Sequence, residues 1–363
     1  MTSDVPNLRF LEFQGEWEKC KLGDYGKVVT GNTPPTKDIE NYENGTYLWA
    51  SPADLGTIKL ISETKTMLSA KGFSKTRALP KGSVLVTCIG STIGKTGMAT
   101  KEMSTNQQIN SIVVNENSDN EFVYYSIQSA FPRYLSSIAV QAVPIISKSA
   151  FELLPNQRPC LQEQKKIGKM LSLLDERIAT QNKIIEDLKM LKSAIIEIEY
   201  TPNTKTTSHI GNVIEQISKR NKNNAIQNVL SVSNRQGFIK QSDQFENRNV
   251  ASEDISNYKI VEKNDFAFNP ARINVGSIAR LTTFEKGIVS PMYICFRTQE
   301  NVAPEYIDFF FESKHFYCEI QKRLEVAKTE HSHPLGMVVS THFRCGKGVK
   351  RGLKNGALPF NID

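Results

Sequence analysis

The chain has 363 residues, 39% of them hydrophobic, and a formal net charge of +7 with a pI of about 8.9. Its length favours two domains with ordinary cores, and its mildly basic balance permits a polyanionic partner. No run approaches roughly eighteen apolar residues, the N-terminus lacks a signal-peptide pattern, and the six cysteines form no C-x-x-C pair. These features argue against a membrane protein, a secreted disulfide framework and a zinc site, and they favour the cytoplasm.

The first half of the chain reads as short strands of alternating hydrophobicity separated by turn residues. The candidate strands are Leu22 to Thr30, Thr46 to Ala50, Gly82 to Thr87 and Gln108 to Val114. A helix-like aromatic stretch follows near residues 121–130. This pattern predicts a mixed α/β globule with an irregular, mostly antiparallel β core.

One stretch of this half, TCIGSTIGKT at Thr87–Thr96, resembles a phosphate-binding loop and raises the question of an NTPase. A P-loop has the spacing G-x-x-x-x-G-K-[ST] and must open a helix, whose N-terminus holds the anion. Gly90 and Gly94 are one residue too close, and another strand rather than a helix follows. The sequence therefore argues against nucleotide hydrolysis and predicts a structural turn between two strands.

A long helix is predicted from Leu161 to Tyr200, because this stretch has no proline and Gly168 is its only glycine. Its apolar residues recur at alternating spacings of three and four, which is a heptad-like stripe typical of a coiled coil. The stripe comprises Ile167, Leu171, Leu174, Ile178, Ile185, Leu188 and Ile195, with Gln181 and Lys192 as polar interruptions. Such a helix measures about 55–60 Å and needs a partner helix.

The second half repeats the first at a nearly constant offset. Its candidate strands are Asn228 to Ser233, Asp265 to Asn269, Gly276 to Leu281 and Pro291 to Arg297, before a helix-like stretch at 304–324. The matches are Gly82–Val86 with Asn264–Phe268 and Ile93-Gly94 with Val275-Gly276 (offset 182), Glu121–Ser129 with Glu305–Ser313 (184), and Leu22–Asp24 with Ile210–Asn212 (188). Matches in one order predict two domains of the same fold.

Segments of both halves resemble a known family. LSVSNRQGFI (Leu230–Ile239), Asn247–Leu281 and GIVSPMYICFR (Gly287–Arg297) resemble the second target-recognition domain of a type I restriction–modification specificity subunit. WEKCKLGDYGKVVTGNTPP, GSTIGKTG and TNQQINSIV resemble the first such domain, and Leu154–Ile195 is similar to the family's central spacer helix with the segment before it. The resemblance covers about residues 17–328.

This resemblance implies a domain order and a function without catalysis. It implies target-recognition domains at residues 1–158 and 201–328, a spacer helix at 159–200 and an atypical segment at 329–363. Each domain would read one half of a bipartite sequence in double-stranded DNA, and the helix would fix the distance between the halves. The partners would be methyltransferase subunits, two in the family, with S-adenosylmethionine, and in some systems an endonuclease subunit with Mg²⁺ and ATP. The chain itself would hold no cofactor or metal.

The residues expected to contact DNA are basic, amide and hydroxyl side chains, because these bind phosphates and read base edges. In the first domain they are Lys71, Lys75, Arg77, Ser91, Thr92, Lys95, Asn106, Gln107 and Gln108. In the second domain they are Asn269, Arg272, Asn274, Ser277 and Arg280. The alternative for each of them is a structural role in a turn or a strand end.

Other groups of residues suggest chemistry less strongly. Asp54, Glu63 and Lys65 have the composition of a nuclease site that holds Mg²⁺, but they read as an ordinary exposed edge. The Asn-Pro-Pro-aromatic signature of an adenine methyltransferase and a Gly-rich dinucleotide loop are missing from the sequence. A metal set could be drawn from the last part of the chain, but its spacing fits no standard site; it would comprise His331, His333, His342 and Cys345.

The resemblance fails after about residue 328. The repeat predicts a second spacer helix there, but the sequence is glycine-rich and basic, without heptads, and nothing in it matches Leu154–Gln164. We therefore expect a chain truncated or frame-shifted near residue 330, or one completed by a recombining gene, with the stripe exposed or paired with a second copy. In the alternative function, such a relative would bind a half-site or sequester the methyltransferase subunit.

Overall fold

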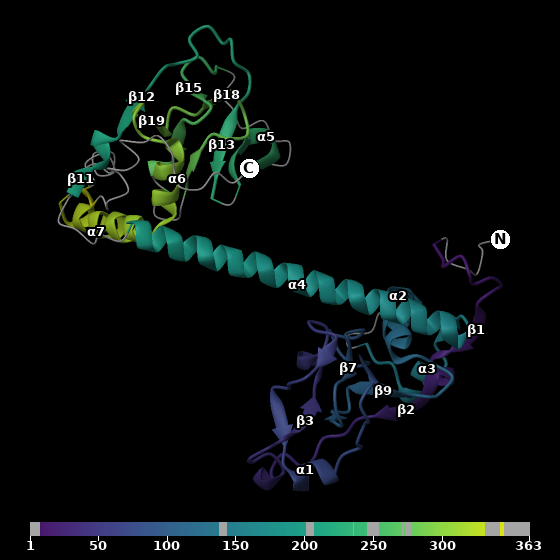
Figure 1. The fold of residues 1–363 in the computed structure, drawn as a ribbon. Coiled ribbons are helices and arrows are strands. Elements are labelled where there is room, and N and C mark those ends of the chain that lie inside the picture. Colours follow the sequence, from purple (N-terminus) through teal and green to yellow (C-terminus); the bar gives the residue numbers. More distant parts are fainter. Residues whose placement is uncertain are drawn as a thin grey trace. The chain divides into compact units, whose positions relative to one another are not determined.

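The computed structural model describes residues 8–137, 144–200, 207–234, 236–244, 254–270, 272, 277–330 and 342–344. The chain divides into two compact units, Met1–Asn182 and Lys183–Asp363, and the boundary falls inside helix α4 (Leu161–Tyr200; Figure 1). Each unit has its own sheets and hydrophobic cores. The expected mixed α/β class is confirmed.

Unit 1 is built on a five-stranded sheet whose central strand is buried on both faces. The strand order is β2 (Gly26–Thr30), β9 (Ile109–Val114), β6 (Val84–Thr87), β7 (Thr96–Ala99) and β4 (Leu60–Ile61). All neighbours are antiparallel except β4 and β7. Along β6, Val84 and Val86 face one hydrophobic core and Leu85 faces the other, which explains why this strand is apolar throughout.

Different elements cover the two faces of this sheet. Helix α2 (Asn120–Ser137) brings Phe122 and Ile127 to one core. A smaller sheet brings Leu48 and Ala50 to the other, in the order β5 (Thr66–Leu68), β3 (Tyr47–Ala50) and β8 (Ser104–Thr105). The other elements of unit 1 are the paired strands β1 (Glu18–Lys21) and β10 (Pro155–Arg158), the 3-10 helices η1 (Leu22–Tyr25), η2 (Ile39–Asn41) and η3 (Pro52–Asp54), and helices α1 (Ala70–Ser74) and α3 (Lys148–Glu152).

Unit 2 has a four-stranded sheet covered by an aromatic-rich helix. The strand order is β12 (Ile214–Ile217), β19 (Ile294–Thr298), β16 (Phe266–Phe268) and β17 (Ile278–Arg280). Phe310 and Phe311 of helix α6 (Pro304–Glu312) pack against this sheet in one core. The other elements are the strand pairs β13 (Leu230–Ser233) with β14 (Gly237–Lys240), β15 (Lys259–Glu262) with β18 (Lys286–Val289) and β11 (Thr207–His209) with β20 (His342–Arg344), the 3-10 helix η4 (Ile210–Asn212), and helices α5 (Gln241–Gln244) and α7 (Lys314–Glu330).

The two units share one strand order. Reading β2, β9, β6, β7 in unit 1 and β12, β19, β16, β17 in unit 2 gives corresponding antiparallel pairs throughout. The offsets of the sequence repeat map these strands onto each other: Val84 begins β6 and Phe266 begins β16, while Thr96 begins β7 and Ile278 begins β17. The repeat seen in the sequence is therefore a repeat of the fold.

Helix α4 begins and ends where the sequence predicts. Ile167 packs against a core of unit 1, and Leu171 is half-buried. Ile196 and Tyr200 join a core of unit 2. Residues 173–195 between these ends are all exposed, and they include the stripe residues Leu174, Ile178, Ile185, Leu188 and Ile195. None of the helices within the described ranges is apolar over a length that could cross a membrane.

Two predicted elements differ in detail, and one strand pair was not predicted. The strand expected from Leu22 begins only at Gly26, because the Asp24 carboxylate accepts a hydrogen bond from the Lys21 N–H (2.7 Å) and closes a 3-10 turn. The helix expected at 304–324 is two helices, because the backbone at Ser313 is extended and its hydroxyl accepts from the Phe316 N–H (3.2 Å). Strand β20 pairs with β11 as β10 pairs with β1, so the repeat reappears at 342–344, where the sequence offers no match. Main-chain pairing of this kind does not depend on side-chain identity.

Residues 331–341 and 345–363 of the atypical segment lie outside the described residues.

Candidate nucleic-acid interface

In unit 1 the sheet register brings several predicted contact segments to one edge. Thr30 at the end of β2 pairs with Asn110 near the start of β9, and Thr87 at the end of β6 pairs with Ile109. Val86 pairs with Thr96 at the start of β7. The segments 31–33, 88–95 and 105–108 therefore meet at this edge, and they carry six of the predicted residues: Ser91, Thr92, Lys95, Asn106, Gln107 and Gln108.

The segment between β6 and β7 is a tight turn. Gly94 N–H donates to the Thr87 carbonyl (2.9 Å) and Thr87 N–H donates to the Lys95 carbonyl (2.9 Å). Gly94 has a φ of +92°, and a Cβ there would lie 2.6 Å from Cδ1 of Phe131, so only glycine fits. The expected structural turn is confirmed, and no helix starts here. Ser91 is exposed, while Thr92 and Lys95 are half-buried.

The segment 106–108 combines a buried structural residue with accessible ones. The Asn106 amide accepts from Gln108 N–H (3.0 Å) and donates to the Gln108 side-chain oxygen (3.1 Å). Asn106 is buried, so it shapes the turn. Gln107 is exposed and bonds to the Thr33 hydroxyl, and Gln108 is half-buried. The two glutamines, rather than Asn106, are therefore within reach of a ligand.

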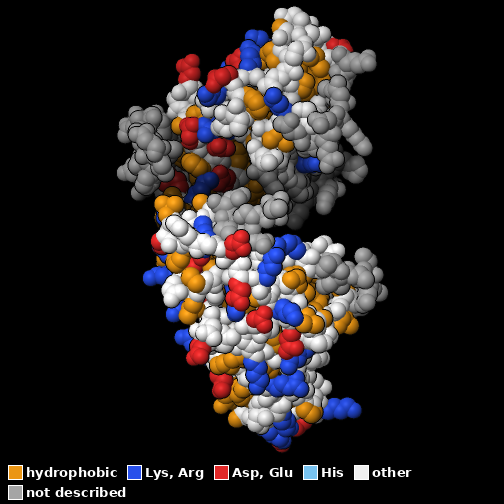
Figure 2. Space-filling view, turned by 90° about the vertical axis from the view of Figure 1, so that its right-hand side faces the viewer, with side chains coloured by type: hydrophobic (Ala, Val, Ile, Leu, Met, Phe, Trp, Pro, Cys, Tyr) orange, Lys and Arg blue, Asp and Glu red, His pale blue; other side chains and the backbone are white. Residues whose placement is uncertain are grey.

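The three basic residues around α1 are exposed but locally paired. Lys71 bonds to Glu40, and Lys75 donates to Asp38 (3.0 Å). The hydrogen bond from Lys75 holds the pKa of the Asp38 carboxyl below its usual value. Arg77 donates through Nη1 to the Thr30 carbonyl (2.6 Å), which brings it to the same sheet edge. Part of the positive charge is thus neutralised locally, and Figure 2 likewise shows basic and acidic side chains interspersed on the face in view.

In unit 2 the corresponding edge carries three of the predicted residues. The turn after β16 is closed by hydrogen bonds from Arg272 N–H to the Asn269 carbonyl (2.9 Å) and from Ser277 N–H to the Arg272 carbonyl (3.2 Å). Arg272 is exposed, whereas Ser277 is buried. Asn274 lies outside the described residues. This turn occupies the place of segment 88–95 in unit 1, because β16 and β17 correspond to β6 and β7.

Arg280 lies at the opposite end of β17 and is held by two carboxylates. Its guanidinium bonds to Glu305 and donates to Asp308 (3.1 Å), both on α6. Its side chain is 14% exposed. Burial raises the pKa of Asp308, and the Arg280 charge opposes that rise. Arg280 therefore links β17 to α6 and does not lie at the edge where DNA contact was predicted.

Sequence reasoning missed Asn32 and Trp49, which lie beside these segments. The Trp49 ring N–H donates to the Asn32 carbonyl (3.1 Å), and the Asn32 amide donates to the Lys75 carbonyl (2.8 Å). The available signal was the Gly31-Asn32 pair directly after an apolar strand, which is a common turn combination. It gave no indication of which segments the asparagine would join.

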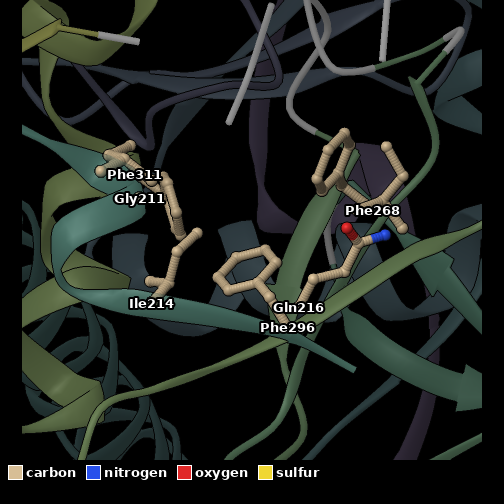
Figure 3. A pocket seen from close by; sticks show the side chains of 8 residues that line it. Gly211, Ile214, Gln216, Phe268, Phe296 and Phe311 are labelled. Carbon is tan, nitrogen blue, oxygen red and sulfur yellow. The ribbon is translucent and has the colours of Figure 1, made fainter. Parts of the chain in front are cut away.

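Within the described ranges, no site supports the nuclease or metal chemistry considered in the sequence. Asp54 caps the η3 turn through the Ser51 N–H (2.8 Å) and accepts from the Lys65 N–H (2.9 Å), so its carboxylate is structural. No group of metal-binding side chains occurs among the described residues, and the His331, His333, His342 and Cys345 side chains lie outside them. A pocket in unit 2 has a volume of about 70 Å³ and is lined by Ile214, Phe268 and Phe296, with Gln216 as its polar residue (Figure 3). Small-molecule sites measure roughly 300–1,000 Å³, so this is a packing gap rather than a ligand site.

Comparisons with known proteins show similarity to DNA specificity domains. Residues 14–190 match the family model described as "Type I restriction modification DNA specificity domain". The chain is 30% identical over 195 residues to the MjaIX specificity subunit of Methanocaldococcus jannaschii, covering 51% of this chain and 45% of that protein. It is 28% identical over 187 residues to the EcoR124I/EcoR124II specificity subunit of Escherichia coli, covering 50% and 45%. The chain thus spans about half the length of these curated relatives.

A solved structure has the same fold as this chain. It is the S subunit of a type I restriction-modification system from M. genitalium, with a TM-score of 0.58 and 14% identity, covering 97% of this chain and 90% of that one. At this identity the likeness concerns the fold alone. It extends over both units, whereas the family model stops within α4.

Proposed function

Residues 14–190 belong to the type I restriction modification DNA specificity domain family. From this premise we propose that the chain is a non-catalytic subunit that binds double-stranded DNA and reads a bipartite target. One observation carries the proposal: both units have the same strand order and expose polar residues at the same sheet edge. Unit 1 reads one half of the target and unit 2 reads the other.

The side chains at these edges suit the two kinds of contact that DNA requires. Lys95, Arg77 and Arg272 would bind phosphates, and these contacts would supply affinity and a salt dependence. Gln107 and Gln108 can form the paired amide contacts that recognise adenine in the major groove. Ser91 and Thr92 add hydroxyl groups on an exposed turn. Arg280, Ser277 and Asn106 are left out of this set because they are buried or ion-paired.

We further propose that methyl transfer takes place on partner chains. The catalytic partners would be methyltransferase subunits carrying S-adenosylmethionine, which flip the target adenine out of the duplex. An endonuclease subunit with Mg²⁺ and ATP would add cleavage. Continuous α4, with 40 residues, would keep the two reading units at a fixed separation and so define the spacing of the half-sites.

A second candidate function rests on the exposed stripe of α4. Ile178 and Leu188 are 58% and 59% exposed, and Leu174, Ile185 and Ile195 are each more than two-fifths exposed. Covering a stripe of this size with a second copy of α4 would remove apolar area from water, worth roughly 25 cal/mol per Å². Two chains paired in this way would read a symmetric target, or would sequester the methyltransferase subunit.

Co-expression with a type I methyltransferase subunit tests both candidates. The host would lack other adenine methylation, and its DNA would be sequenced for methylated adenines. A split, asymmetric motif supports one chain reading two halves. A symmetric split motif supports pairing through α4, and sedimentation of the Ile178→Asp, Ile185→Asp variant then shows whether the stripe makes the dimer. Purified complex without any methylated motif contradicts the reading function.

A further inference from the structure

A single asparagine joins the segments that carry the contact residues of unit 1. Asn32 follows β2, and all four of its polar groups are bonded. Its backbone N–H donates to the Thr105 carbonyl (2.9 Å), and its carbonyl accepts from the Trp49 ring N–H (3.1 Å). Its side-chain amide donates to the Lys75 carbonyl (2.8 Å) and accepts from the Arg77 N–H (3.0 Å). One residue thus connects β8, β3 and the segment 75–77.

The residues on either side of Asn32 also contact the segments that it joins. A Cβ on Gly31 would lie 2.2 Å from the Asn106 carbonyl oxygen and 2.3 Å from that of Thr105, so only glycine lets β2 approach segment 105–108 this closely. Thr33, on the other side, bonds to Gln107 through its hydroxyl. Segments 75–77 and 106–108 are therefore positioned against each other by residues 31–33.

We propose that Asn32 is the positioning residue for DNA reading by unit 1, an inference that rests on the proposed function. Each of its polar groups already bonds within the protein, which favours a positioning role over direct reading of a base edge. Its side chain holds the backbone of Arg77. The next residue, Thr33, bonds to Gln107, so a shift of Asn32 would also move Gln107. An unfilled hydrogen bond here would let both segments shift, and reading a base requires their geometry to be fixed.

Unit 2 also has a bonded asparagine after the corresponding strand. Asn221 follows β12, the strand that corresponds to β2, and it is fully buried. Its backbone N–H donates to the Tyr258 carbonyl (3.0 Å). Its side-chain amide donates to the Ile226 carbonyl (2.9 Å) and accepts from the Ile226 N–H (3.1 Å). Asn221 thus closes a local loop after this strand, so an asparagine in this region has a structural role in both units.

The chain also offers a matched control at the opposite edge of the same sheet. Asn115 follows β9, donates through its side-chain amide to the Asp24 carbonyl (3.1 Å) and accepts from the Asn117 N–H (3.1 Å). It therefore makes the same two kinds of side-chain bond as Asn32. No predicted contact residue belongs to the segments that it joins.

The test compares Asn32→Leu with Asn115→Leu in the full chain assembled with its methyltransferase. Affinities are measured for duplexes carrying the methylated motif and for duplexes with either half scrambled. We expect Asn32→Leu to lose about ten-fold in discrimination for one half only, which is the size of one good base contact. Binding to fully scrambled DNA should change less than about two-fold, because phosphate contacts dominate it. Asn115→Leu should keep discrimination in both halves.

A double-mutant cycle separates positioning from general destabilisation. If Asn32 positions Gln107, the double variant Asn32→Leu, Gln107→Ala should discriminate little worse than Gln107→Ala alone, whereas Asn115→Leu with Gln107→Ala should show independent effects. Should Asn32→Leu fail to fold, Asn32→Asp keeps the acceptor for the Arg77 N–H and provides the second variant. Equal discrimination by the Asn32 and Asn115 variants, or independent effects in the cycle, overturns the inference. A wild-type complex without discrimination overturns the proposed function itself.

Discussion

At the scale of single residues, the basic side chains differ in how much of their charge remains for a ligand. Lys71 and Lys75 share Asp38, and Arg280 is held by α6. Lys95 and Arg272 instead lie on the turns after β6 and β16, at the candidate contact edges of the two sheets. Charge count alone, as read from a sequence, cannot make this distinction, because the acidic partner of Arg280 lies more than two dozen residues away in the chain.

Lys95 should contribute one phosphate contact. We expect Lys95→Gln to weaken binding to all DNA sequences alike and to lower the slope of log K against log salt by about 0.9, as loss of one neutralised phosphate requires. The measurement is a salt titration of binding by fluorescence anisotropy. Lys81 is an exposed lysine at the start of β6, at the opposite edge, and Lys81→Gln should leave the slope unchanged. Equal slopes for the two variants would remove Lys95 from the interface.

Arg272 and Arg280 should respond to substitution in opposite ways. Arg280→Gln leaves the part-buried Asp308 without its cation, so unit 2 should lose about 1–3 kcal/mol of unfolding free energy. Arg272→Gln on the exposed turn should leave stability within about 0.5 kcal/mol and weaken DNA binding instead. Hydrogen exchange of α6 reports the first effect and anisotropy the second. A destabilised Arg272 variant, or a stable Arg280 variant with weak DNA binding, would reverse these roles.

Asp265 should give unit 2 a pH-dependent stability. Burial of its side chain raises the pKa of Asp265, although the Glu262 N–H (2.7 Å) and Arg297 (3.0 Å) oppose the rise. The folded unit therefore binds the proton more strongly than the unfolded chain, whose value is about 3.9. The stabilising effect is complete below that value and is lost as pH rises through the folded pKa.

Comparing the pH-dependent stability of the wild type with that of Asp265→Asn isolates the contribution of the Asp265 proton. We expect the stability advantage of the wild type over the variant to be largest at the acid end and to shrink as pH rises. Hydrogen exchange of β16 and β19, measured for both proteins at each pH, gives the difference directly, since the intrinsic exchange rates cancel. An advantage that grows with pH would show that the ion pair with Arg297 outweighs burial.

At the scale of elements, periodicity predicted long features well and short ones poorly. The bounds of α4 follow from a heptad stripe between proline-containing segments, and the tertiary structure leaves them unchanged. Among the strands that went unpredicted are β1, β10, β14, β15 and β18, whose short sequences alternate too little to signal a face. The candidate site of unit 1 could be predicted only as a set of loops, from Ser91 to Gln108, because the burial of Asn106 and the bonds of Asn32 depend on long-range pairing.

Gly168 should be required for the contact between α4 and α2. A Cβ at this position would lie 2.5 Å from Oδ1 of Asp119 and 2.9 Å from the Phe122 backbone nitrogen. Asp119 caps α2 by accepting from that Phe122 N–H (2.9 Å), so the methyl group would displace the cap. Alanine favours a helix by about 1 kcal/mol over glycine, but loss of a cap and of close packing costs more.

We therefore expect Gly168→Ala to destabilise unit 1 by about 1–2 kcal/mol. The loss should be seen as faster hydrogen exchange in the first turn of α2. Ser193→Ala, at an exposed position of the same helix, should instead stabilise slightly through helix propensity. If Gly168→Ala also stabilises, the close approach between α4 and α2 is not present in solution.

At the scale of the whole molecule, the repeat supports the proposal that the two units read DNA independently. Each has its own cores, and no residue of the unit 1 cores appears in those of unit 2 among the described residues. The offsets in the sequence were enough to predict this duplication, since corresponding strands share sheet positions as well as spacing. The equivalent of the β1–β10 pair at β11–β20 was not predictable, because its pairing uses main-chain groups alone.

If the two units read DNA independently, substitutions in each should affect a different half of the methylated motif. Gln107→Ala removes an exposed amide of unit 1, and Asn269→Ala removes the amide at the start of the corresponding turn of unit 2. Contributions of groups without shared partners are additive, so each variant should relax bases in its own half of the motif and leave the other half intact. The double variant should relax both halves by the same amounts. Sequencing of methylated adenines in the host reports all three outcomes in one experiment. Relaxation of both halves by either single variant would mean that the halves are read jointly, and that the repeated fold is not matched by a division of recognition.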